Sequence, residues 1–170
     1  MRTWDTICGK AEAGERLSSA EGVYLFEKAD LHQLGQLADR VRERKVGNRA
    51  SYVVNRYLNY SNVCLLSCQF CAFARKRREP GTFEHSVEEL TEAARKSLAQ
   101  GITELHIVGG LHPGLPYSFY LEMLRSLAAL EPRPVLKVFT AIEIRHLAER
   151  VAKKPIVEVL ADLKEAGMVS

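Results

Sequence analysis

The sequence lacks the features that mark membrane, secreted or nucleic-acid-binding proteins. No apolar run approaches the roughly 20 residues that a membrane-spanning helix needs, so we expect no membrane partner. Residues 1–15 contain acidic side chains and no apolar core, which argues against a secretory signal peptide. The net charge of +3 is too small to predict a nucleic-acid partner. We therefore expect a cytoplasmic protein, and 46% hydrophobic with 26% charged residues is ordinary for a globular one.

Cysteine is scarce, and its distribution argues against a disulfide framework. The chain has four cysteines, and three of them, Cys64, Cys68 and Cys71, lie in one short segment. Thiolates at such spacing bind iron–sulfur clusters or zinc. A closed zinc site needs four ligands, which His85 or His112 would have to complete through the fold. The spacing favours a [4Fe–4S] cluster with one open iron, and structural zinc or cysteines without a ligand remain as alternatives.

The chain is expected to have two parts. Residues 1–50 are predicted to form an N-terminal helical extension, in which Asp30 caps a helix that runs to about Lys45. Residues 51–170 alternate between short runs rich in β-branched residues and longer amphipathic segments. Alternation of this kind gives parallel strands with right-handed crossovers, so the predicted fold class is α/β.

Three βα units are predicted in the second part. Ser86 and Glu89 indicate a capping box at the start of its first helix. The predicted strands are 51–58, 104–110 and 135–139, and the predicted helices are 87–98, 118–130, 142–151 and 156–166. A complete (β/α)8 barrel takes about 250 residues. We therefore expect a partial parallel (β/α) barrel, truncated before its fourth strand, whose missing C-terminal half is needed for activity and solubility.

The cysteine segment and a glycine pair are expected to share one rim of this barrel. The cysteines follow the first predicted strand, and Gly109 and Gly110 end the second. Active sites of parallel β/α folds lie at the C-terminal ends of the strands. Both chemical signals are therefore predicted to lie at the active rim.

The cysteine segment resembles the signature of the radical S-adenosylmethionine (radical SAM) superfamily. Its pattern is Cys64-x3-Cys68-x2-Cys71, and Phe70 is the aromatic residue that precedes the last cysteine. The resemblance implies a [4Fe–4S] cluster whose open iron is chelated by S-adenosylmethionine. It also implies an electron donor, such as flavodoxin or ferredoxin, because one electron cleaves the sulfonium and releases a 5′-deoxyadenosyl radical. In such enzymes the cofactors supply the chemistry and the protein orients them.

Other segments resemble one family within that superfamily. Residues 59–73 resemble the branch that makes deazaflavin and futalosine intermediates, and within that branch residues 21–27, 104–113 and 139–144 are most similar to the aminodeoxyfutalosine synthases of menaquinone biosynthesis. The resemblance implies a transferase that joins the 5′-deoxyadenosyl group to a small molecule, 3-[(1-carboxyvinyl)oxy]benzoate. The neighbouring alternatives are the dehypoxanthine futalosine cyclase and the deazaflavin (FO) synthase subunit. An alternative of another class is a non-catalytic iron–sulfur or zinc-binding module.

The resemblance also assigns candidate residues beside the cysteines. Gly109 and Gly110 lack a Cβ, which would let the backbone approach the methionyl amino group, and the alternative is a turn that needs positive φ. The other candidates lie near the predicted rim: Phe70, Asn59, Thr140 and Glu143 for S-adenosylmethionine, and His112 for the substrate. Glu143 has an alternative place in the first turn of the next helix, where the helix dipole favours an anion.

Structural roles are predicted for two further groups. His106 lies inside the second predicted strand, and we expect it to be packed within the fold. The basic run Arg75–Arg78 follows the cysteines and is expected to be a solvated loop. Its functional alternative is attraction of an anionic substrate or an acidic electron donor.

Overall fold

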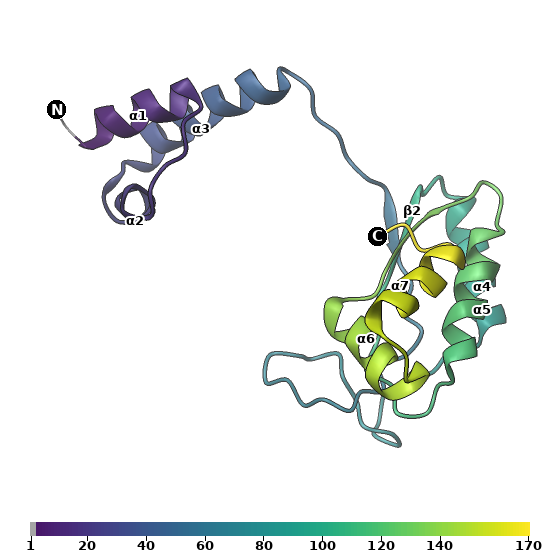
Figure 1. Cartoon of the computed structure of the whole chain (residues 1–170). Coiled ribbons are helices and arrows are strands. Elements are labelled where there is room, and N and C mark those ends of the chain that lie inside the picture. The colour runs from purple at the N-terminus through teal and green to yellow at the C-terminus, as the bar shows by residue number, and fades with distance from the viewer. Residues whose placement is uncertain (1–2) are drawn as a thin grey trace. The chain divides into compact units, whose positions relative to one another are not determined.

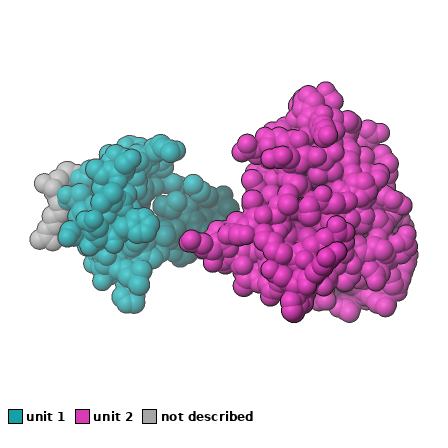
Figure 2. All heavy atoms as spheres, turned by 90° about the horizontal axis from the view of Figure 1, so that it is seen from below, with its two compact units in different colours: residues 1–52 teal, residues 53–170 magenta. Residues whose placement is uncertain are grey.

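The computed structural model describes residues 3–170, in two compact units that comprise residues 3–52 and residues 53–170 (Figure 2). Within residues 3–170, no helix has both the length and the apolar character needed to cross a membrane.

The first unit is helical. Its helices are α1 (Thr3–Ala13), α2 (Ser19–Lys28) and α3 (Leu31–Val46). Asp30 caps α3, because its carboxylate accepts hydrogen bonds from two backbone N–H groups of the first turn. Gly47 ends α3 at φ 61°, a conformation that suits glycine. The predicted helix from Asp30 to about Lys45 is thereby confirmed.

The second unit is built on a three-stranded parallel sheet. The strands β1 (Asn55–Tyr57), β2 (Glu104–Ile107) and β3 (Val135–Val138) lie in the order β1-β2-β3. The predicted α/β class and parallel sheet are confirmed. The first predicted strand, 51–58, was too long, because the ladder begins where Asn55 faces the first residue of β2. Residues 51–53 precede that point, so their β propensity finds no neighbouring strand in this sheet.

Helices follow each strand and cover one face of the sheet (Figure 1). They are α4 (Val87–Leu98), α5 (Tyr117–Ala128), α6 (Ala141–His146), the π-helix η1 (Leu147–Ala152) and α7 (Ile156–Glu165). The predicted capping box at the start of α4 is present. The predicted helices are confirmed, with boundaries that shift by one or a few residues.

Strand alternation decides which side chains form the core. Leu105, Ile107, Leu136 and Val138 are buried with the apolar faces of α4, α5 and α7. The residues between them point to the other face, where His106 is half-buried and Lys137 is exposed. Of the two faces open to His106 in the sequence, its register gives it the one opposite the buried leucine and isoleucine of β2, where it is half-buried and stacks on Tyr57.

The chain after α7 runs beside the outer edge of β3. The N–H of Val169 donates to the carbonyl of Leu136 at 2.9 Å, and the N–H of Val138 donates to the carbonyl of Ser170 at 2.7 Å. These bonds place the last residues where the fourth strand is predicted. One edge of β3 is thus already partly paired.

Candidate cluster-binding site

The three cysteines lie in the loop between β1 and α4, at the C-terminal ends of the strands. Cys68 is exposed and Cys64 and Cys71 are half-buried, and each thiol is free. The N–H of Cys71 donates to the carbonyl of Cys68 at 3.0 Å, which closes the turn between these two cysteines. The sulfur of Cys64 accepts from the N–H groups of Leu66 at 3.4 Å and Leu111 at 3.3 Å. Because Leu111 follows the glycine pair, this bond joins the cysteine loop to the rim of β2.

The donor set fits a four-iron cluster. A cavity of about 230 Å³ lies against Cys68 and Cys71. Hydrogen bonds to the sulfur, such as those at Cys64, stabilise a thiolate and are a usual part of iron–sulfur sites. Within residues 3–170, no group of three or more His, Cys, Asp or Glu side chains converges as metal ligands, the three cysteines included, so the fit rests on the number and type of the donors. Three soft thiols without a fourth ligand match a cluster with an open iron better than a closed zinc site.

Lys76 holds the first part of the cysteine loop. Its ammonium donates to three successive backbone carbonyls, at 3.1 Å to Cys64, 3.1 Å to Leu65 and 2.8 Å to Leu66. The guanidinium of Arg75 likewise donates to backbone carbonyls of the loop. The basic run is a largely solvated loop, as predicted, and within it these two cations bond the backbone of the cysteine loop. Carbonyls that otherwise face water receive a charged donor, which fixes the loop beside the first thiol.

Replacing Lys76 with methionine is expected to lower cluster loading several-fold. Methionine keeps most of the side-chain length but removes the donor shared by three carbonyls, so the loop at Cys64 loosens. Iron and acid-labile sulfide per chain after anaerobic reconstitution measure the effect. Arg78→Met is the matched control, because it removes a neighbouring cation of the same run. Equal iron content in both variants and the parent protein would show that the loop keeps its shape without Lys76.

The glycine pair is required by close packing. A Cβ on Gly110 would lie 2.0 Å from the carbonyl oxygen of Val63 and 3.0 Å from the Cβ of Cys64. A Cβ on Gly109 would lie 2.3 Å from the ring of Tyr60. Neither glycine has a positive φ, so the alternative of a turn that needs positive φ was wrong. The missing side chains let the rim of β2 pass directly against the cysteine loop.

Glu143 joins the segments that follow all three strands. Its carboxylate is 3% exposed and accepts from the hydroxyl of Tyr60 at 3.0 Å and the N–H of Gly109 at 2.9 Å. Its other oxygen accepts from the N–H of Thr140 at 2.7 Å and the hydroxyl of Thr140 at 2.8 Å, as part of a capping box. Burial, followed by the charge of Glu143, raises the pKa of Tyr60, which keeps its proton and donates. Glu143 thus takes its alternative place in the first turn of α6.

His112 holds the loop that follows the glycine pair. Its side chain is buried, and its Nδ1 accepts from the N–H groups of Gly114 at 3.0 Å and Leu115 at 2.9 Å. The proton of the neutral ring therefore lies on Nε2. Nε2 is 3.0 Å from a carboxylate oxygen of Glu84, but it is out of line for a hydrogen bond and has no other partner in residues 3–170. In this structure the imidazole of His112 holds the backbone of Gly114 and Leu115 in place. Contact between His112 and a substrate remains a prediction.

The last two candidate residues are Phe70 and Asn59. Phe70 is 93% exposed in the cysteine loop and packs against no core. Asn59 is half-buried, and within the described part of the chain its Oδ1 has no hydrogen-bond partner. The structure therefore brings Cys64, Gly109, Gly110, Thr140 and Glu143 together and leaves Phe70 apart. Sequence reasoning missed the bonds of Lys76, because nothing in a basic run indicates which cation contacts the neighbouring loop.

Comparison with known proteins agrees with this geometry. The family profile of the radical SAM superfamily matches residues 58–170. The aminodeoxyfutalosine synthase of Streptomyces coelicolor is 43% identical, over 95% of this chain and 41% of that protein. The aminodeoxyfutalosine synthase of Thermus thermophilus is 38% identical, over 95% of this chain and 43% of that protein. The chain therefore spans about two-fifths of the length of these curated relatives.

A solved structure shares the fold. The X-ray structure of the FeFe-hydrogenase maturase HydG from Carboxydothermus hydrogenoformans matches with a TM-score of 0.63. The match covers 96% of this chain and 46% of that one, at 22% identity. At this identity the likeness concerns the fold alone, and it relates the three-stranded sheet to part of a larger barrel.

Proposed function

Because this chain belongs to the radical SAM superfamily, we propose that it is the cluster-binding part of an aminodeoxyfutalosine synthase. The proposed reaction joins the 5′-deoxyadenosyl group of S-adenosylmethionine to 3-[(1-carboxyvinyl)oxy]benzoate. The deoxyadenosyl carbon adds to the enolpyruvyl double bond, and the aryl group migrates from the ether oxygen to the adjoining carbon, so that an aryl–carbon bond replaces the aryl–oxygen bond and the oxygen becomes a ketone. The carboxylate then leaves as carbon dioxide, which water hydrates to bicarbonate, and the electron used for the cleavage is returned. The relatives that carry this name support the choice of reaction.

The observation that carries the proposal is the junction of the cysteine loop with the rim of β2. Cys64, Cys68 and Cys71 are the proposed ligands, and when bound the cluster supplies the electron that cleaves the sulfonium of S-adenosylmethionine. The N–H of Leu111 donates to the sulfur of Cys64, which aligns the backbone after Gly110 with the first ligand. The glycine pair carries no side chains of its own, which lets the rim of β2 pack directly against Tyr60 and the cysteine loop, and we propose that the methionyl amino group binds at this rim.

The remaining proposed residues position this junction. Glu143 fixes the ends of the three strands relative to one another through Tyr60, Gly109 and Thr140. We propose that Thr140 and Glu143 serve S-adenosylmethionine by this positioning, and that Asn59 offers its unpaired Oδ1. Phe70 projects from the cysteine loop, where an exposed ring is free to cover the adenine. The reaction also needs a reductant, for which flavodoxin or ferredoxin is the proposed donor.

Product analysis tests the proposed reaction. The protein containing this chain is reconstituted anaerobically, reduced, and incubated with S-adenosylmethionine and 3-[(1-carboxyvinyl)oxy]benzoate. We expect mass spectrometry to detect aminodeoxyfutalosine. Parallel incubations replace the acceptor with dehypoxanthine futalosine, or with the two precursors of deazaflavin. A product only in one of those incubations assigns the neighbouring activity, and no cleavage of S-adenosylmethionine in any of them would identify a non-catalytic module.

A further inference from the structure

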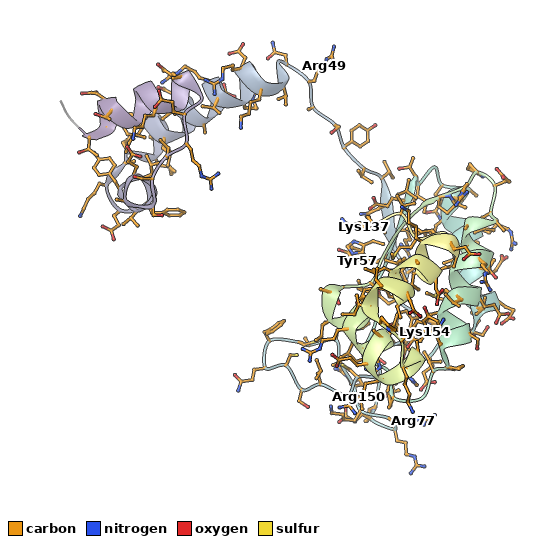
Figure 3. All side chains as sticks on the ribbon, viewed as in Figure 1. Arg49, Tyr57, Arg77, Lys137, Arg150 and Lys154 are labelled. Atoms are coloured by element: carbon orange, nitrogen blue, oxygen red, sulfur yellow. The ribbon has the colours of Figure 1, made fainter. Side chains whose placement is uncertain are left out.

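The face of the sheet that the helices do not cover carries three neighbouring side chains: a phenol ring, an imidazole and an ammonium group. Tyr57 of β1 is the register partner of His106 of β2, which is in turn the partner of Lys137 of β3. Register partners lie about 4.8 Å apart on neighbouring strands and point to the same face. Figure 3 shows Tyr57 and Lys137 on the side of the sheet away from α4 and α5. We call Tyr57, His106 and Lys137 the cross-strand row.

Two members of the row already form an aromatic platform. The rings of Tyr57 and His106 stack with centroids 4.7 Å apart and an angle of 22° between their planes. Tyr57 is nevertheless 60% exposed, so this platform has free surface on the open face. A planar ring is the kind of group that packs against such a surface.

The third member of the row supplies a cation without a protein counterion. Within the described residues, Lys137 takes part in no ion pair and no side-chain hydrogen bond. Glu104 is the carboxylate of β2 on the same face, but it accepts from the amide of Asn55 at 3.4 Å. Lys137 is exposed on the open face of the three-stranded sheet, and on the inner face of a complete barrel pairing with an anion would offset the cost of burying its ammonium.

The row lies close to the proposed site of radical formation. Tyr57 is the last residue of β1, and His106 and Lys137 are the penultimate residues of β2 and β3. His106 precedes Gly109 by three residues, which corresponds to roughly 10 Å along a strand. A molecule on the row would therefore reach toward the rim that carries the cysteine loop.

We propose that the cross-strand row binds the aromatic carboxylate of the substrate. The arene lies against His106 and Tyr57, and the carboxylate pairs with the ammonium of Lys137. The inference rests on the proposed function, which supplies a substrate that is a benzoate. S-Adenosylmethionine also combines a flat ring with a carboxylate, but its methionyl group is proposed to lie above the row, at the glycine pair. The test must therefore distinguish binding of the benzoate to this row from binding of S-adenosylmethionine.

The test compares Lys137→Met with Lys137→Arg, and Lys164→Met, on the outer surface of α7, is the matched control. Equilibrium dialysis measures the Kd of 3-[(1-carboxyvinyl)oxy]benzoate on the reconstituted protein that contains this chain. Formation of 5′-deoxyadenosine without any acceptor measures use of S-adenosylmethionine. We expect Lys137→Met to raise the Kd of the benzoate about tenfold, which corresponds to one lost charge-assisted contact. Lys137→Arg should stay within about threefold of the parent protein, and acceptor-independent cleavage should be unchanged.

The other possible outcomes contradict the inference, the proposed function, or both. An unchanged Kd in Lys137→Met overturns the inference. Parallel loss of acceptor-independent cleavage overturns it too, because it assigns Lys137 to S-adenosylmethionine or to the fold. If the parent protein binds the benzoate without forming product, the proposed function fails while the dialysis still tests the row. If the parent protein does not bind the benzoate at all, both proposals fail.

Discussion

Alanine at Cys64, Cys68 or Cys71 is expected to abolish the [4Fe–4S] cluster, whereas alanine at Cys8 should leave it intact. In the proposed site three thiolates hold one cluster, so the loss of any one leaves too few ligands. Cys8 lies in α1, in the first compact unit, where burial and then Glu12 raise the pKa of its thiol.

Iron and sulfide analysis measures this effect. The parent protein and Cys8→Ala should each take up about four irons per chain on anaerobic reconstitution, and the three other variants close to none. Circular dichroism is expected to be unchanged in all four variants, because none of these sulfurs belongs to the apolar core of the sheet. One zinc and no cluster in the parent protein, under iron-replete anaerobic conditions, would contradict the assignment.

The elements that the sequence predicts well are those with local causes. Asp30 and Ser86 mark helix starts because each side chain bonds N–H groups within three residues. Strand length is predicted less well, since a strand exists only where a neighbour offers a ladder. The residues that precede Asn55 include β-branched side chains, but the ladder with β2 begins only at Asn55. Pairing is a property of two segments, and a pattern within one segment cannot fix it.

The candidate site was predictable in position but not in its internal contacts. Parallel topology places the cysteines and Gly110 on one rim, and the structure places them there. Alternation within β2 indicates that His106 and Ile107 face opposite ways, but it does not indicate which of them meets the helices. The bonds of Lys76 depend on how a loop returns on itself. Glu143 likewise reaches Tyr60 and Gly109 only through the tertiary arrangement.

Alanine at Gly110 is expected to disrupt the site, although it adds a single methyl group. The backbone of Gly110 has no positive φ, so alanine is not excluded by conformation. Its Cβ would instead lie 2.0 Å from the carbonyl oxygen of Val63, and a backbone atom cannot turn aside as a side chain can. The rim of β2 or the cysteine loop must therefore move. That movement separates the N–H of Leu111 from the sulfur of Cys64, now 3.3 Å apart.

Gly114→Ala is the matched control for this steric effect, because it lies in the same rim loop. A Cβ at Gly114 would meet Arg77 Nη1 at 3.7 Å, an ordinary contact, and its φ is not positive. Alanine there should be neutral or stabilise the fold by about 0.4–1 kcal/mol. We expect Gly110→Ala to lose most of the change that S-adenosylmethionine causes in the electron paramagnetic resonance spectrum of the reduced cluster, and Gly114→Ala to keep it. A full response in Gly110→Ala would mean that the cysteine loop tolerates displacement, and that the close approach of the two segments does not set the geometry of cofactor binding.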